Sequence, residues 1–225
     1  MNSISFRTEQ EAFWAGEFGN DYIRRNNGAE LVAANLALFS EIIQRTRSIA
    51  SVIEFGANIG LNLRALRQLL PNSELSAIEI NAAAAEALRV TGDTRVYQQS
   101  ILDFQPDFQR DLVLIKGVLI HIAPEVLTDV YDRLHASSRR YICLVEYYNP
   151  TPTEVRYRGH EARLFKRDFA GEMLDRFPDL HLIGYGFKYH RDPAFPGGHG
   201  DDSWFLLEKS EPMIPPTAIP VPQPL

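Results

Sequence analysis

The chain has 225 residues, of which 45% are hydrophobic and 23% are charged. At about 150 residues per domain this length indicates one full domain with additions, and the balanced composition excludes a disordered, collagen-like or coiled-coil chain. Lys and Arg number 23 against 29 Asp and Glu, so the net charge is -6. This is the wrong sign for a protein that coats nucleic acid or an anionic membrane, so we expect neither as a partner.

The single cysteine and the N-terminal residues bear on the compartment. One cysteine excludes an internal disulfide framework and, within one chain, a Cys-rich zinc site. Cys143 lies in an apolar run that is typical of a buried strand. No run of about 18 uncharged apolar residues occurs, and Arg7, Glu9 and Glu11 stand where a signal peptide would have its apolar core. We therefore expect a cytoplasmic protein.

Two patterns of hydrophobic residues divide the chain. Residues 9–26 and 30–46 have helical periodicity, and we assign residues 1–48 to an N-terminal helical lid. From residue 52 onward, short apolar runs alternate with amphipathic segments. Residues 211–225 are rich in proline and are predicted to form an extended tail.

The core domain, residues 49–210, is predicted to be a doubly wound α/β domain. Its predicted strands are 52–55, 75–80, 95–98, 112–116, 141–146, 181–189 and 203–209. The predicted helices between them are 61–70, 82–90, 124–135 and 167–177. Continuous apolar strands that alternate with helices indicate a Rossmann-like, mostly parallel sheet covered on both faces. The Pro- and Gly-rich loop 191–202 is typical of a hairpin, so we expect seven strands with the last one antiparallel.

The strongest motif joins the first predicted strand to the following helix. Glu54 stands two residues before Gly56, and Asn58 and Gly60 follow in the turn. Glycine lets the backbone approach a ligand closely, and a helix N-terminus offers unsatisfied N–H groups. Glu79, at the end of the second strand, is suited to accept hydrogen bonds from both hydroxyls of a ribose. The glycine turn and this acid together predict a nucleoside site.

The spacing of the motif selects among nucleoside cofactors. A dinucleotide fingerprint requires Gly-x-Gly-x-x-Gly, and Asn58 stands where its second glycine should be. The phosphate-loop pattern is absent. An acid two residues before the first glycine, here Glu54, is typical of S-adenosylmethionine (SAM) methyltransferases, in which it helps to place the methionine ammonium. We therefore expect SAM rather than NAD.

Later strand ends fit the same site. Ser100 and Ile101 follow the third strand, where a polar group can read the adenine edge and Ile101 can cover its face, although Ser100 is equally consistent with an ordinary strand end. Lys116 ends the fourth strand at the carboxyl edge of the sheet, where open α/β sheets bind ligands. His121 is the first candidate for a general base because its ordinary pKa is in range. Glu146 ends the fifth strand and can orient His121 or bind the acceptor; for both residues a structural role is equally consistent.

Stretches outside the general SAM motifs carry a more specific resemblance. They are residues 8–22, 116–122, 146–150, 157–160, 164–171 and 189–192, together with 56–63 in the glycine turn. Over residues 7–209 the chain resembles the methyltransferases associated with pseudaminic acid biosynthesis. The resemblance implies a SAM-dependent methyltransferase, or a direct descendant of one, with an amino-sugar or sugar-nucleotide type of substrate. Asn58 departs from the broad SAM pattern but is shared with this family.

A local basic cluster contrasts with the acidic chain. Residues 156–167 hold five basic side chains against one acid, a net +4, which suits a phosphate, sulfate or carboxylate on the acceptor. A solvated helix start would carry the same charges. In the helical lid, Trp14 and Tyr22 can contact ligand or belong to the core. The full set of candidate substrate-binding residues is Trp14, Tyr22, Tyr147, Tyr148, Arg156, Arg158, His160, Lys166 and His190.

We therefore predict a SAM-dependent methyltransferase that acts on a small, polar, anionic acceptor of amino-sugar or related secondary-metabolite type. One alternative keeps the fold but catalyses an intramolecular displacement or cyclisation on a charged small molecule. Another is a non-catalytic binding subunit. No metal site is expected, because the histidines are scattered and Asp201 and Asp202 have the character of ordinary loop acids. A homodimer or a partner protein from the same pathway stays open.

Overall fold

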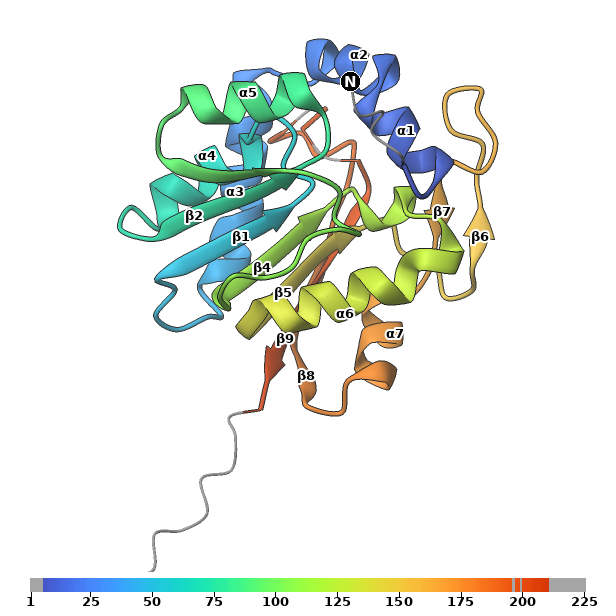
Figure 1. Ribbon diagram of the computed structural model, residues 1–225. Coiled ribbons are helices and arrows are strands. Elements are labelled where there is room, and N and C mark those ends of the chain that lie inside the picture. The colour runs from blue at the N-terminus through green and yellow to red at the C-terminus, as the bar shows by residue number, and fades with distance from the viewer. Residues whose placement is uncertain (1–5, 196, 199, 211–225) are drawn as a thin grey trace, which may run out of the picture.

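A seven-stranded sheet in the order β3-β2-β1-β4-β5-β9-β8 forms the centre of the protein (Figure 1). The computed structural model describes residues 6–195, 197–198 and 200–210. The strands of the sheet are β1 (Ser51–Phe55), β2 (Glu74–Glu79), β3 (Thr94–Gln98), β4 (Arg110–Lys116), β5 (Ser138–Glu146), β8 (Leu180–Lys188) and β9 (Asp202–Lys209). Strands β1 to β5 pair in parallel, and β9 is antiparallel to both of its neighbours, β5 and β8. The predicted Rossmann-like fold with an antiparallel last strand is therefore confirmed.

Helices cover both faces of this sheet. α3 (Ala29–Ile43), α4 (Leu61–Leu69) and α5 (Ala82–Val90) bury apolar side chains against one face. α6 (Leu127–Ser137) and α7 (Phe169–Arg176) do so against the other. The central strands are buried on both faces, which explains why their sequences are almost continuously apolar. Polar side chains that could bind a ligand must therefore come mainly from the loops at the ends of these strands.

Two helices begin at the carboxyl edge of the sheet for clear local reasons. Gly60 precedes α4 with a φ of 79°, in the left-handed region that favours glycine. Asn81 caps α5: its side-chain oxygen accepts hydrogen bonds of 3.0 and 3.1 Å from the backbone N–H groups of Ala83 and Ala84. The turns after β1 and β2 are thus held next to each other by their own sequences.

The N-terminal segment differs from its prediction in two respects. The helix expected over residues 9–26 is two helices, α1 (Glu9–Ala15) and α2 (Glu17–Arg25), because Gly16 between them has an extended backbone. Aromatic spacing continues across the break, so periodicity did not reveal it. α3, which the prediction placed in the lid, buries Leu38 and Phe39 in the core under the sheet. The lid consists of α1 and α2, beyond the carboxyl ends of β1 and β4 (Figure 1).

A second, two-stranded sheet was not predicted. Its strands, β6 (Thr153–Glu154) and β7 (Phe165–Lys166), frame the loop that was assigned to substrate binding. The predicted tail, residues 211–225, lies outside the described residues. None of the described helices has the length and apolar character needed to cross a membrane.

Candidate functional site

A cavity of about 530 Å³ opens at the carboxyl edge of the sheet. It lies where β1 and β4 are neighbours, the point at which the strand order reverses and at which open α/β sheets bind ligands. The loops after β1 to β5 form its floor, and the lid forms its roof. Among residues 6–195, 197–198 and 200–210, no group of three or more His, Cys, Asp or Glu side chains is placed to hold a metal ion.

The turn after β1 is closely packed. Gly56 has a φ of 75°, and a Cβ there would lie 2.7 Å from the Val118 side chain. Asn58 also lies in the left-handed region, with a φ of 48°, a conformation that asparagine tolerates better than most residues. Its side-chain oxygen accepts a hydrogen bond of 2.6 Å from the backbone N–H of Ile59. The departure from the usual glycine at position 58 therefore has a local explanation.

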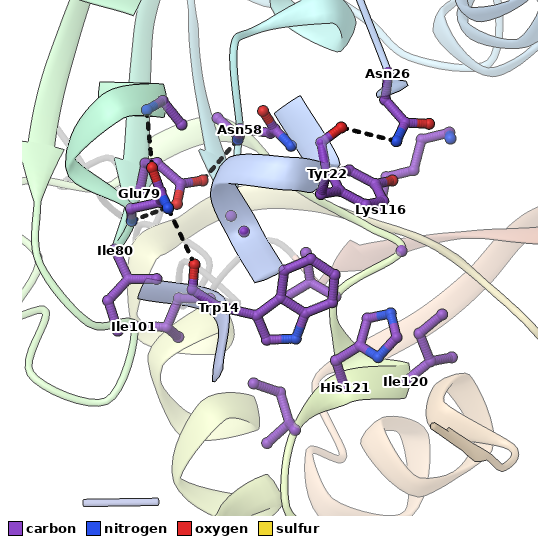
Figure 2. Close-up of a pocket in the computed structure, with 18 of the residues that line it drawn as sticks. Trp14, Tyr22, Asn26, Asn58, Glu79, Ile80, Ile101, Lys116, Ile120 and His121 are labelled. Atoms are coloured by element: carbon purple, nitrogen blue, oxygen red, sulfur yellow. Dashed lines mark hydrogen bonds between the residues drawn. The ribbon is translucent and has the colours of Figure 1, made fainter. Parts of the chain in front are cut away.

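Glu79 fastens this turn to the end of β2. One carboxylate oxygen accepts a hydrogen bond of 2.7 Å from the backbone N–H of Asn58, and the other accepts one of 2.7 Å from the N–H of Asn81 (Figure 2). Burial raises the pKa of Glu79, and these N–H donors oppose the shift. The backbone N–H of Ile80 is a third donor to this carboxylate. A carboxylate offers about four acceptor sites, so acceptor capacity remains for a ligand in the cavity.

Glu54 lies beneath the turn and does not line the cavity. It is fully buried, and one oxygen accepts a hydrogen bond of 2.5 Å from the side-chain amide of Asn62. The other oxygen has no partner among the described residues. Burial raises the pKa of Glu54 to about 8, against the nearby Asn62 donor and the Lys116 charge. Gly60 also stands behind the cavity wall; its role is to let the chain enter α4.

Lys116 forms the floor of the cavity together with an acid that the sequence analysis set aside. Its ammonium lies 3.6 Å from a carboxylate oxygen of Asp202, the first residue of β9. Burial lowers the pKa of Lys116, but Asp202, Tyr22 and Glu54 raise it, and the net shift is upward. Asp202 reaches the cavity because β9 inserts beside β5, where its neighbour Ser203 pairs with Glu146 at the carboxyl end of that strand.

Glu146 shapes the loop after β4. Its carboxylate accepts hydrogen bonds of 2.9, 2.9 and 3.4 Å from the backbone N–H groups of Val118, Leu119 and Ile120. Burial raises its pKa to about 7, and the three N–H donors act against the shift. These donors belong to the turn of 3₁₀ helix η1 (Leu119–His121), so Glu146 orients His121 through the backbone.

His121 is buried and reaches the cavity from η1. Its Nδ1 lies 2.5 Å from the carbonyl oxygen of Arg163. A carbonyl can only accept, so Nδ1 carries the proton and the neutral ring keeps a lone pair on Nε2. Burial lowers the pKa of His121 to about 4, against that hydrogen bond. This is below the ordinary value on which its choice as a base rested, so the case for His121 depends on its position and tautomer. The ring centroid lies 4.7 Å from that of Trp14 (Figure 2) and 4.8 Å from that of Tyr157.

The lid is joined to the core by specific contacts. The Asn81 side-chain amide donates hydrogen bonds to the backbone oxygen of Trp14 at 3.2 Å and to the side chain of Asn20 at 2.9 Å. Tyr22 lines the cavity near Lys116 (Figure 2), and burial raises its pKa. The two lid residues proposed as ligand contacts, Trp14 and Tyr22, therefore both face the cavity.

The basic segment 156–167 does not form one anion site. Arg163 pairs with Glu9 at 2.9 Å, and Arg167 pairs with Glu172 at 2.7 Å. The Arg156 guanidinium donates to a backbone oxygen at 3.3 Å in an exposed loop. Most of these charges are therefore solvated or paired with acids and do not converge on one place. Arg158 is the basic residue of the segment that lines the cavity.

The remaining candidates divide into two groups. Tyr147 lines the cavity, as do Ser100 and Ile101. Four others lie outside the cavity lining. His160 packs on Phe13 at 5.1 Å between ring centroids, and Lys166 lies 5.0 Å from the centre of the Tyr147 ring. The His190 ring lies 2.8 Å from Asp201, and Tyr148 is 43% exposed.

No protein-family model matches the chain, and no curated protein matches it. Solved structures do. The 1,6-didemethyltoxoflavin-N1-methyltransferase of Burkholderia thailandensis, crystallised with 1,6-didemethyltoxoflavin and S-adenosylhomocysteine (SAH), is 15% identical, with a TM-score of 0.67 over 94% of this chain and 93% of its own. The magnesium protoporphyrin IX methyltransferase of Synechocystis, with bound SAM, is 12% identical, with a TM-score of 0.64 over 92% of this chain and 100% of its own.

A third solved structure, a mitomycin 7-O-methyltransferase, is 14% identical, with a TM-score of 0.62 over 90% of this chain. The chain spans 61% of the length of that enzyme. The chain has the fold of these methyltransferases. At this level of identity the similarity extends to the fold, and the chemistry must be argued from the residues of the cavity.

Proposed function

We propose that the protein is a SAM-dependent methyltransferase that acts on a small polar acceptor. The observation that carries the proposal is the position of the Glu79 carboxylate, which holds the Gly56 turn through Asn58 and keeps acceptor capacity toward the cavity. The solved methyltransferases with this fold contain SAM or SAH, which agrees with the nucleoside site expected from the sequence.

The residues of the cavity fit such a cofactor. Glu79 keeps acceptor capacity for the ribose hydroxyls beside its backbone donors. Ile80 and Ile101 offer apolar surfaces for adenine. The backbone at Gly56, where a Cβ would clash with Val118, gives the close approach that the methionine part needs. Lys116 lines the cavity and can bind the carboxylate of the methionine part. The unpaired oxygen of Glu54 lies behind the lining of the cavity.

SAM supplies a methyl group on a sulfonium, and the protein must align an acceptor atom with it. Alignment alone can contribute about 7–11 kcal/mol to the barrier reduction. His121 is placed to accept the proton of the acceptor at Nε2, because Nδ1 is committed to the Arg163 carbonyl. Trp14 and Tyr22 close the lid over the cavity and exclude water.

The acceptor is proposed to carry an anionic group, as amino-sugar derivatives with a carboxylate do. Arg158 lines the cavity, and its guanidinium has no acidic partner among the described residues. Its backbone has a φ of 48°, a strained conformation for arginine that is more common at functional sites. Asp202 and Tyr147 also line the cavity and suit hydroxyl or amine groups of the same molecule.

Calorimetric titration of the protein with SAH tests the cofactor part of the proposal, and we expect a single site with micromolar affinity or better. No binding at millimolar SAH would refute it. A screen of small acceptors with SAM carrying a labelled methyl group tests the transfer. Binding of SAM together with conversion of a charged substrate without label transfer would instead support the intramolecular displacement or cyclisation.

A further inference from the structure

Glu11 of the lid contacts the loop after β3. Its Oε1 accepts a hydrogen bond from the hydroxyl of Ser100. Its Oε2 accepts from the backbone N–H groups of Thr8 at 3.0 Å and Arg7 at 2.6 Å, which completes the capping box of α1. The Ser100 hydroxyl in turn accepts from the backbone N–H of Leu102 at 3.0 Å. Ser100 therefore positions Glu11, and its own hydrogen-bonding capacity is largely used.

The Glu11 carboxylate has acceptor capacity to spare. An ionised carboxylate offers about four acceptor sites, two on each oxygen. The two backbone donors occupy those of Oε2, and the Ser100 hydroxyl occupies one of those on Oε1. The remaining site is on the oxygen next to Ser100, and Glu11 and Ser100 both line the cavity.

This site lies where the nucleobase of the proposed cofactor belongs. With the ribose on Glu79, the base extends toward Ile80 and Ile101, which Figure 2 shows on the side of Glu79 that is away from Lys116. The backbone N–H of Ile101 has no hydrogen-bond partner among the residues that the structure describes. The bond between Ser100 and Glu11 thus brings an acceptor, the Glu11 carboxylate, to the residue that precedes Ile101, whose N–H is a donor.

That pairing matches one edge of adenine. Adenine offers a donor, its exocyclic amine, beside an acceptor, the adjacent ring nitrogen, whereas hypoxanthine offers a carbonyl oxygen beside a ring N–H. We propose that Glu11 accepts a hydrogen bond from the exocyclic amine, so that the lid itself reads the base and cofactor binding holds the lid closed. This inference rests on the proposed function.

The other links between the N-terminal part of the lid and the core are exposed or single. Arg7 pairs with Asp103 at 3.1 Å, and both side chains are about half exposed. The pair between Glu9 and Arg163 involves a Glu9 side chain that is 83% exposed, and exposed pairs contribute little. The Gln10 side chain donates one hydrogen bond of 3.0 Å to the backbone oxygen of Ala162. A charge-assisted hydrogen bond from the cofactor to Glu11 would therefore be a major contribution to closure of α1.

The test compares SAH with S-inosylhomocysteine, in which a carbonyl oxygen replaces the exocyclic amine, by calorimetric titration. The wild type should prefer SAH by about 10- to 100-fold, the loss expected for a hydrogen bond to a charged group. Glu11→Gln should abolish most of this preference, because its amide can donate to the carbonyl oxygen of the analogue. Glu17→Gln, an exposed acid in the first turn of α2, is the matched control and should keep it.

A second measurement addresses the lid. Hydrogen exchange of the α1 and α2 amides should slow when SAH is added to the wild type or to Glu17→Gln, and should slow much less in Glu11→Gln. Equal affinities of the wild type for SAH and the analogue would overturn the inference, as would a Glu11→Gln variant that keeps the wild-type preference. If the wild type binds neither compound, the proposed function fails and the inference fails with it. SAH binding without discrimination removes the role of Glu11 alone.

Discussion

The Nδ1 atom of His121 and the carbonyl oxygen of Arg163 lie 2.5 Å apart, and this contact joins the loop after β4 to the loop between β6 and β7. It sets the tautomer of the histidine. The ring proton is on Nδ1, where it is donated to the Arg163 carbonyl. The lone pair of Nε2 is therefore available to act as a base. Two expectations depend on this arrangement.

Replacing His121 should impair turnover far more than cofactor binding. A positioned base contributes about 10²- to 10⁴-fold, so kcat of His121→Asn should fall by that factor while the Kd for SAH changes by less than about threefold. His181→Asn, on the exposed edge strand β8, is the control. Similar losses in kcat and SAH affinity would indicate a structural role for His121.

The stability of the fold should depend on His121 at mildly acidic pH. Its pKa is lowered from 6.5 to about 4, so the neutral form is favoured in the folded protein. The contribution is fully present above pH 6.5 and is lost as the pH falls toward 4, because the unfolded chain takes up a proton that the folded one does not. Between pH 7.5 and 5, the free energy of unfolding of the wild type should fall by about 2 kcal/mol relative to His121→Asn. Urea titrations at both pH values measure this difference, and parallel curves would contradict it.

Loss of the Glu79 carboxylate should abolish cofactor binding. Glu79→Ala removes the acceptor for two backbone N–H groups as well as the proposed ribose contact, so the SAH dissociation constant should rise by at least about 100-fold. Glu74→Ala, at the exposed start of the same strand, should leave SAH affinity unchanged. Titration of both variants checks this, with thermal melts to show that each is folded. SAH affinity within a few-fold of wild type in Glu79→Ala would exclude the proposed cofactor position.

Arg158 should matter to the acceptor, and Arg156 should not. Both side chains are exposed, but Arg158 lines the cavity without an acidic partner among the described residues, whereas Arg156 is outside the lining. Once the label-transfer screen yields an acceptor, Arg158→Ala should raise its KM by about 10- to 100-fold, the range for a charged hydrogen-bonded pair. Arg156→Ala should leave KM within twofold of the wild type. A larger rise in KM for Arg156→Ala than for Arg158→Ala would contradict this prediction and would support the anion site first expected over residues 156–167.

Local sequence pattern determined the fold of this protein and predicted where its cavity would open. Apolar strands that alternate with amphipathic helices specify the sheet because each strand must be buried on both faces. The acid and glycines at 54–60, with Glu79, predicted a nucleoside site because these residue types stand at the ends of two adjacent parallel strands.

Tertiary structure alone decided which distant residues share the cavity. The charges of residues 156–167 add to +4 along the chain, but Glu9 and Glu172 neutralise two of them in space, and Arg158 is the one that lines the cavity. In the sequence, Asp202 had the character of an ordinary loop acid, and Glu11 was one of several charges near the N-terminus. They became site residues only because β9 inserts beside β5 and the lid folds onto the loop after β3. Contacts of this kind depend on long-range packing, which no local spacing of residues encodes.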